Sequence, residues 1–279
     1  MTDDVDLGLF GPDSVSWRVH AEPILWVAGL RALYLQALHP RAIEGVVQNS
    51  NYKDDPWGRL MRTAEYVGTV IYGTTADAER AGARLRRLHG RLRARDPETG
   101  EEFRIDDPHL LRWVHVTEVD SFATTARRSG VGLTDADVDR YYAEQLRAAE
   151  LVGLEPGTVP CSAAEIEDYY QRMRPELALT APAVDVARFL AMPPMPKGLG
   201  WTPARPAWAV VAAAGFALLP RWARRIYRMP GLPTTDVAAT VTARLGRAAL
   251  AALPLKPGPI YTDAMRRAEA VRSRSAAAA

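Results

Sequence analysis

The sequence predicts an all-α fold, a single mostly helical domain with at most one small hairpin. Apolar residues recur at helical spacing in nearly every segment that lies between turn signals. Many of these segments begin with a helix-capping residue, and proline occupies the first helical position in several of them. Only the stretch 95–105, with a turn followed by extended residues, is typical of a hairpin. No repeat occurs at a fixed period.

The expected elements follow one another in the order of these signals. A long helix begins after Pro23 and ends at His39-Pro40. It is apolar around most of its circumference, so it should be central. A short helix over 41–47 and a polar loop over 48–55 come next. Further helices are expected from Asp55-Pro56 to Ile71, from Thr74 or Thr75 through His89, from Asp107-Pro108 to Thr125, from Thr134 to Ala149, after Cys161-Ser162, over 183–190, over 236–252 and over 260–272.

The chain is expected to form one domain over residues 1–272, followed by a disordered tail over 273–279. Its 279 residues are enough for one large domain or two small ones. The connector over 193–206 holds five prolines and two glycines and could mark a boundary before a C-terminal helical part. The apolar run over 207–219 is shorter than the roughly 20 residues of a transmembrane helix, which favours a buried core helix. A dip into a membrane surface is the alternative, since four arginines follow the run.

Composition narrows the classes of function. Apolar residues make up 48% and charged residues 24% of the chain, as in folded soluble proteins. The net charge of +2, without interleaved basic and aromatic residues, gives no reason to expect a nucleic-acid partner. The single Cys161 excludes an intramolecular disulfide framework and a cysteine metal cluster. No secretory signal is recognisable, so a cytoplasmic location is expected, with peripheral membrane contact as an option.

His89 is the first candidate functional residue. It lies on the flank of an apolar helical stripe that consists of Ala81, Leu85, Leu88 and Leu92. The small residues Ala78 and Gly82 share this flank and would leave room for a flat, bulky group beside the imidazole. Haem is such a group, and a neutral imidazole is a common proximal ligand of its iron. The alternative is a core histidine with a hydrogen-bond partner.

Arg59 and Thr63 form the second candidate group, because residues four apart share a helical face. A guanidinium and a hydroxyl together offer directional donors to an anionic oxygen. The alternative is a surface arginine beside a threonine that bonds the carbonyl four residues earlier.

The segment from Trp113 to Ser121 provides the third candidate, His115. It shares a face with Leu111, Val119 and Phe122, so it should be buried, and Glu118 one turn away could fix its tautomer. A contact with a cofactor and a hydrogen-bonded place in the core are both open. His39 and His109 carry weaker signals: His39 is at a helix end, where the dipole favours a cation, and His109 should be exposed at a helix start.

Four motifs occur in a fixed order and give these candidates a common context. They are Leu38-His39-Pro40 with Gly45-Val46, Asp55-Pro56-Trp57-Gly58-Arg59-Leu60 with Arg62-Thr63, Leu85-Arg86-Arg87-Leu88-His89, and Trp113-Val114-His115-Val116-Thr117 with Asp120-Ser121. Together they resemble the haem-dependent oxygenases typified by the rubber-cleaving latex clearing protein and by MpaB. The resemblance covers about residues 8–125 well, and the remainder matches in helical character more than in motif.

The resemblance implies a role for each matched residue. His89 would be the proximal haem ligand, and Arg59 and Thr63 would line the distal side. Arg62 stands where the rubber oxygenase has a lysine, which keeps the charge but loses the compact ammonium. Glu44 lies at about the right separation to be the distal base of that enzyme, without a firm alignment. Asn49 replaces a histidine that is common in the family.

The resemblance also implies the chemistry. We expect a helical domain that encloses a pocket for haem b, because the covalent Cys-x-x-Cys-His attachment is absent. His115 and Asp120 would shape the surroundings of the haem. Dioxygen would be the co-substrate, a small apolar molecule, such as a lipid or isoprenoid, the substrate, and the electron donor is unknown. The alternatives are a peroxidase-like or sensor haem protein and a helical binding protein without cofactor.

Overall fold

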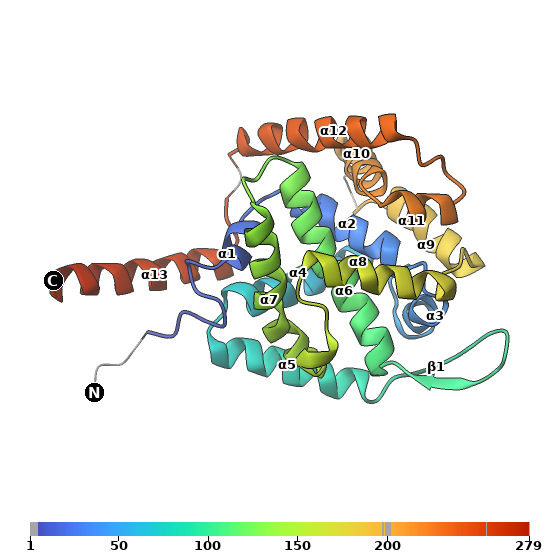
Figure 1. The fold of residues 1–279 in the computed structure, drawn as a ribbon, viewed down its shortest axis with the longest axis horizontal. Coiled ribbons are helices and arrows are strands. Elements are labelled where there is room, and N and C mark those ends of the chain that lie inside the picture. Colours follow the sequence, from blue (N-terminus) through green and yellow to red (C-terminus); the bar gives the residue numbers. More distant parts are fainter. Residues whose placement is uncertain (1–4, 197, 199–201, 255, 279) are drawn as a thin grey trace.

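The structure, a computed structural model, describes residues 5–196, 198, 202–254 and 256–278. These residues are mostly helical with one small hairpin, which confirms the predicted all-α class (Figure 1). The helices are α1 (Val15–His20), α2 (Leu25–Gln36), α3 (Pro40–Asn49), α4 (Pro56–Tyr72), α5 (Thr75–His89), α6 (Pro108–Arg128), α7 (Asp135–Val152), α8 (Ala163–Met173), α9 (Ala181–Ala191), α10 (Ala204–Ala217), α11 (Arg221–Ile226), α12 (Pro233–Ala251) and α13 (Pro259–Ala278). The strands are β1 (Arg93–Arg95) and β2 (Glu102–Arg104), and the short 3-10 turns are η1 (Pro156–Thr158) and η2 (Arg174–Glu176).

Helix α2 is central, as its apolar circumference predicts. It packs against α6 on one side and α10 on the other. The approach of α10 is close because Gly215 has no side chain: a Cβ there would lie 3.0 Å from the Val27 carbonyl oxygen and 3.1 Å from the Leu30 Cβ.

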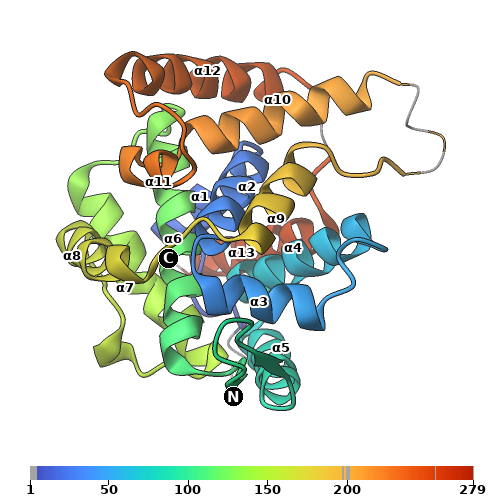
Figure 2. The ribbon, with the colours of Figure 1, turned by 90° about the vertical axis from the view of Figure 1, so that its right-hand side faces the viewer.

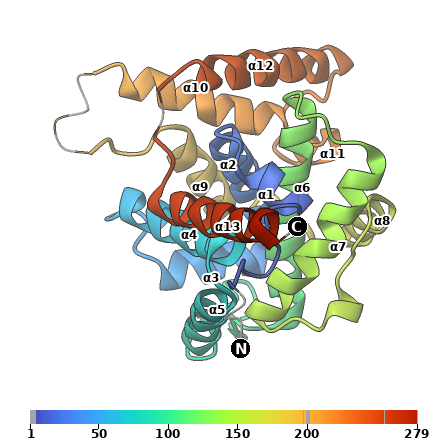
Figure 3. The ribbon, with the colours of Figure 1, turned by 90° about the vertical axis from the view of Figure 1, so that its left-hand side faces the viewer.

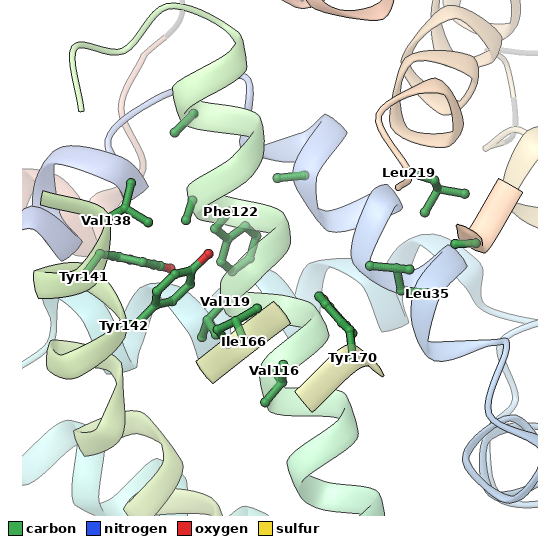
Figure 4. Close-up of a cluster of buried hydrophobic side chains, with 14 of the residues drawn as sticks. Leu35, Val116, Val119, Phe122, Val138, Tyr141, Tyr142, Ile166, Tyr170 and Leu219 are labelled. Carbon is green, nitrogen blue, oxygen red and sulfur yellow. The ribbon is translucent and has the colours of Figure 1, made fainter. Parts of the chain in front are cut away.

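The main core lies between α2, α6, α7 and α8. Figure 4 shows Tyr141 and Tyr142 of α7 directed toward the face of α6 that carries Phe122 and Val119. Tyr170 of α8 lies in the same cluster. Each of these helices therefore buries one face against α6, which positions α6 firmly for the candidate residues that it carries.

The predicted helix starts are confirmed where a side chain caps the helix. Asp55 accepts a hydrogen bond from the Gly58 amide at 2.9 Å, and Asp107 accepts one from the His109 amide at 2.8 Å. Thr74 and Thr134 both form complete capping boxes, with the aspartate three residues later bonding back to the threonine. A capping bond joins residues within one helical turn, so it forms whatever the helix packs against.

The predicted hairpin is present and links α5 to α6. Ala94 pairs with Phe103, and both side chains are buried against Leu110 near the start of α6. The Ile105 amide donates to the Leu92 carbonyl at 3.3 Å. The hairpin thereby holds the end of α5 beside the beginning of α6.

The C-terminal helices pack onto the N-terminal core and do not form a separate part among the described residues. The indole of Trp57 on α4 donates to the Pro194 carbonyl at 2.8 Å and contacts the Trp208 ring, with ring centroids 4.8 Å apart. Arg128 at the end of α6 donates to the hydroxyl of Thr240 on α12 at 3.0 Å. The segments on the two sides of the connector, which was a candidate boundary, therefore contact each other directly.

Two expectations about the C-terminal third differ from the structure. Helix α10 buries only one face, at Ala212 and Gly215, so the prediction of a buried core helix was wrong: its many alanines bury little area, and Val210 is exposed. Helix α13 continues to Ala278, across the segment expected to be a disordered tail, in keeping with the helix propensity of its alanines. Ala279 lies outside the described residues. Figure 3 shows α13 crossing α4, on which it packs.

Candidate functional site

His89 is the last residue of α5 and is partly buried. Neither ring nitrogen has a hydrogen-bond partner among the described residues. The alternative, a core histidine with a hydrogen-bond partner, would require one. Burial lowers the pKa of the imidazole, and the nearby Asp106 carboxylate opposes this shift. The ring is therefore neutral at pH 7, which is the form that ligates a metal.

The apolar stripe expected beside His89 is not buried along its whole length. Leu88 is exposed, so the prediction that it faces the interior was wrong. Ala78 and Gly82 are the buried positions of α5 because α7 packs there: a Cβ on Gly82 would lie 2.8 Å from the Leu151 carbonyl oxygen. These small residues allow the two helices to approach, so the room expected over them is occupied by α7.

Arg59, on the first turns of α4, is partly buried, and its guanidinium has no hydrogen bond or ion pair with any described residue. Burial is the main cause that lowers the pKa of its guanidinium, and the Arg62 charge acts in the same direction while Tyr52 opposes it. An arginine stays charged in proteins, so this is a poorly hydrated cation without a counter-charge. Such a group favours an anionic partner.

Thr63 and Arg62 are both exposed and engaged locally. The Thr63 hydroxyl donates to the Arg59 carbonyl at 3.1 Å, which is the ordinary helical contact considered as the alternative for this residue. Arg62 forms an ion pair with Asp55, the cap of the same helix, at 3.0 Å. Their predicted distal roles stay predictions.

His115 and Glu118 lie one turn apart on α6. His115 is buried, and burial lowers its pKa to about 4, so the ring is neutral. Burial raises the pKa of the Glu118 carboxyl to about 7. No hydrogen bond joins the two, so the expectation that Glu118 fixes the His115 tautomer does not hold. Neither side chain has a hydrogen-bond partner among the described residues.

Tyr66 of α4 faces Glu118 and was not among the predicted residues. Its buried hydroxyl has no hydrogen-bond partner, and burial, with a smaller effect of the Glu118 charge, raises its pKa to about 12. Tyr66 follows Arg59 by seven residues, which is two helical turns on the same face. That spacing was the signal from which Tyr66 could have been found.

Asp120 is occupied by structural partners. It forms an ion pair with Arg31 of α2 at 2.9 Å and accepts hydrogen bonds from Tyr170 at 2.9 Å and Tyr142 at 3.2 Å. Thr124 donates to the same carboxylate at 2.9 Å. Its predicted effect on a haem, which stays a prediction, would therefore act through the position of α6.

Glu44 of α3 is buried and accepts a hydrogen bond from the Gln48 amide at 2.9 Å. The same amide nitrogen donates to the Arg95 carbonyl at 2.8 Å, and Asn49 donates to the Arg93 carbonyl at 2.9 Å. Asn49, which replaces a family histidine, thus joins α3 to β1. The distal-base role of Glu44 stays a prediction.

Helices α4 and α5 form a wedge, the residues 56–89, that diverges from the turn at Gly73-Thr74. Figure 3 shows α5 almost end-on where α4 runs lengthwise, and Figure 2 shows the same divergence from the opposite side. Arg59 and His89 both lie near the open end, roughly 20–25 Å along their helices from the turn at 1.5 Å per residue. Helix α6, held at this end by the hairpin, brings His115 and Glu118 toward the wedge.

The wedge gathers polar groups that lack partners, namely His89, Arg59, Tyr66, His115 and Glu118. Among their polar atoms only the Tyr66 hydroxyl is fully buried, and an unsatisfied buried group costs about 1–3 kcal/mol. The polar atoms of the other four keep some contact with the surface, which leaves them accessible to a ligand. A haem fits this set: the neutral imidazole could ligate iron, and the guanidinium could pair with a propionate. Two surface hollows of the described residues lie elsewhere, on α1 with α13 and on α12, so it is the unpaired groups that indicate the site.

A second cluster, His39, His109 and Glu176, was not predicted as a group. His39 is the N-cap of α3 and is buried, so the expectation of a cation at a helix end was wrong; burial lowers its pKa to about 4. His109 was expected to be exposed but is half-buried, with 42% of its side chain accessible. Glu176 comes from η2, far away in the sequence, and no local pattern could have placed it beside the two histidines.

A comparison with protein families places these residues within one kind of domain. Residues 17–252 match the family model described as "ER-bound oxygenase mpaB/B'/Rubber oxygenase, catalytic domain". This match spans the wedge, α6, the connector and most of the C-terminal helices. No curated protein and no solved structure gives a significant match to the chain.

Proposed function

The chain belongs to the family of the ER-bound oxygenase mpaB/B' and rubber oxygenase catalytic domain, and from this premise we propose that it is a haem b-dependent oxygenase that oxidises a small apolar substrate. One observation carries the proposal. A neutral imidazole without a partner, His89, and a guanidinium without a counter-charge, Arg59, lie at the open end of the same wedge. A partly buried cation and an unpaired metal ligand on neighbouring helices fit a cofactor that is both a metal complex and an anion.

The haem would be held without a covalent bond, since Cys161 is the only cysteine. His89 would ligate the iron, and Arg59 would pair with a propionate or with an anionic oxygen on the distal side. When bound, the haem would supply the activation of dioxygen, the co-substrate, with electrons from a donor that is not identified. In this proposal Arg62 and Thr63 assist on the distal side after rotating away from Asp55 and from the Arg59 carbonyl.

Glu118 is the group in the wedge best suited to hold a proton near neutral pH. Its carboxyl has a pKa of about 7, so it can donate or accept a proton at that pH. Its neighbour His115 stays neutral and does not compete for the proton. Glu44 is the alternative base, and its bond to Gln48 fixes its position.

An apolar substrate is consistent with an exposed apolar stripe on α12, at the top of Figure 1. Val237, Val241 and Leu245 share one face and are 67%, 50% and 66% exposed. We propose that this stripe contacts a membrane surface from which the substrate is drawn. Among the described residues no helix is both long and apolar enough for a membrane span. Flotation with phospholipid vesicles tests the contact, and Val241→Glu should abolish it.

The haem spectrum tests the main proposal. Protein produced with sufficient haem should bind one equivalent and show a Soret band near 400 nm, as expected roughly for histidine-ligated haem. His89→Ala should lose this band, whereas Arg87→Ala, an exposed position of the same helical turn, should keep it. A colourless wild-type protein would favour a helical binding protein without cofactor. Haem binding with peroxide-dependent but no dioxygen-dependent turnover would favour the peroxidase-like alternative.

A further inference from the structure

Three side chains with metal-ligating atoms meet around the start of α6. His39 lies at the α2–α3 junction, His109 on the first turn of α6, and Glu176 in η2. Their ligand atoms all lie within 4.8 Å of one another. The His109 Nε2 is 2.7 Å, and the His39 Nε2 3.8 Å, from the same Glu176 Oε2.

The His39 Nε2 is the decisive atom. It is buried without a hydrogen-bond partner, and its distance from Glu176 is too long for a hydrogen bond. The His109–Glu176 contact alone would be an ordinary surface pair, and it leaves this nitrogen unsatisfied. A buried polar atom without a partner costs about 1–3 kcal/mol, so the cluster is incomplete as it stands.

We infer that His39, His109 and Glu176 bind a divalent transition-metal ion such as Zn²⁺, at a site separate from the haem. Two imidazoles and one carboxylate are a common zinc ligand set, with the remaining position open to water. Tetrahedral ligands at the usual zinc distances of 2.0–2.2 Å lie about 3.3–3.6 Å apart, so the present separations of 2.7 and 3.8 Å need only small adjustments. His109 and Glu176 are 42% and 47% exposed, which leaves a path for the ion and its water.

Metal binding would change the tautomer of His39. At present its Nδ1 accepts a hydrogen bond from the Ala42 amide, so the proton is on Nε2. A metal on Nε2 requires the proton on Nδ1, and the Ala42 bond would then be lost. This bond is weak because it is 3.4 Å long, and Pro40 and the His39 carbonyl still define the start of α3.

The consequence would be a clamp between three segments. The Ala178 amide already donates to the Leu38 carbonyl at 2.9 Å, which holds the chain after η2 against the α2–α3 junction. A metal would add the start of α6 to this contact. Because α6 also carries His115 and Glu118, the clamp would fix the helix that borders the wedge, although the metal itself would not touch the haem.

Zinc titration of the metal-free protein tests the inference. We expect one Zn²⁺ per chain by calorimetry and a higher melting temperature in its presence, whereas Mg²⁺ should give neither. His109→Ala and Glu176→Gln should each weaken zinc binding at least tenfold. Glu167→Gln, an exposed carboxylate on α8, and His89→Ala should bind zinc as the wild type does.

The outcomes separate this site from the proposed haem site. Wild-type affinity in Glu176→Gln, or equal binding of Mg²⁺ and Zn²⁺, would overturn the ligand assignment. Loss of zinc binding in His89→Ala but not in His109→Ala would show that zinc occupies the wedge instead, which also overturns it. Because the zinc measurements need no haem, a failure of the oxygenase proposal would leave this test intact.

Discussion

Arg31 of α2 and Asp120 of α6 form a buried ion pair, with 2.9 Å between Nη2 and Oδ2. Their side chains are only 4% and 9% exposed. Arg31 also donates to the Ser121 hydroxyl at 2.7 Å and to the Leu218 carbonyl at 3.1 Å, so the pair joins three segments of the core. Buried charges of this kind are stable only when their hydrogen bonds are complete, and here they are.

Asp120→Ala should therefore destabilise the protein strongly. The substitution leaves the Arg31 charge buried without its partner and removes the acceptor of the Tyr142 and Tyr170 hydroxyls. We expect a loss of about 3–5 kcal/mol in the free energy of unfolding, measured with denaturant. Asp168→Ala, an exposed aspartate on α8, is the control and should change it by less than about 0.5 kcal/mol. A stable Asp120→Ala protein that lost only haem would instead support a direct role beside the cofactor.

The contact of α5 with α7 depends on Gly82. Gly82→Ala places a Cβ 2.8 Å from a backbone oxygen and 2.9 Å from the Leu151 Cβ, so the helices must move apart. We expect a net destabilisation of about 1–3 kcal/mol, despite the better helix propensity of alanine. Gly68→Ala in α4 is the matched control, because its Cβ would meet only Ile260 at an ordinary 3.8 Å. It should leave stability unchanged or raise it by up to about 1 kcal/mol.

The raised pKa of Glu118 makes part of the stability depend on pH. The folded-state pKa is about 7 and the usual value is 4.5, so the folded protein holds a proton between these pH values that the unfolded chain releases. Stability from this group is therefore complete below pH 4.5 and is lost as the pH rises to 7, with a difference on the order of 3 kcal/mol.

Glu118→Gln should remove this dependence. Relative to the wild type, the variant should gain unfolding free energy between pH 5 and pH 8, as measured by urea titration at each pH. The buried His115 has the opposite effect, since its lowered pKa reduces stability as the pH falls below 6.5. The comparison between variant and wild type cancels that contribution. An equal pH dependence in both proteins would mean that Glu118 titrates normally.

The sequence predicted those parts of the fold that depend on local signals. Asp55, Thr74 and Thr134 mark helix starts because a cap acts on amides within three residues of itself. Which residues are buried was harder to predict. Leu88 belongs to an apolar stripe at helical spacing, yet it is exposed, because the partner helix α7 covers the face of α5 that carries Gly82. Which face of α5 is covered depends on the position of α7, which no pattern within α5 encodes.

The sequence could indicate which residues belong to the candidate site, but not which neighbours they contact. Motif order led to Arg59, His89 and His115, and the structure places them around one wedge. The Thr63 bond to its own helix and the occupied carboxylate of Asp120 depend on neighbours that motifs do not specify. The cluster of His39 with Glu176 required the fold itself, because these residues come from segments that are distant in the sequence.

Arg59 gives the most direct test of the distal side. Its guanidinium has no hydrogen bond or ion pair among the described residues, so Arg59→Ala removes no such bond and, if the role is distal, should leave stability and haem content nearly unchanged. It should reduce dioxygen-dependent turnover of unsaturated apolar substrates by about 10²–10³-fold, the usual effect of removing one preorganised donor.

Azide binding offers a second measurement of the Arg59→Ala variant, and it needs no substrate. Binding of this anion to the ferric protein should weaken at least tenfold, since a charge-assisted hydrogen bond contributes about 1.5–3 kcal/mol. Arg87→Ala should behave as the wild type in both assays. Unchanged azide affinity and turnover in Arg59→Ala would exclude the distal role and leave Arg59 only the pairing with a propionate, which a lower haem affinity of the variant would reveal.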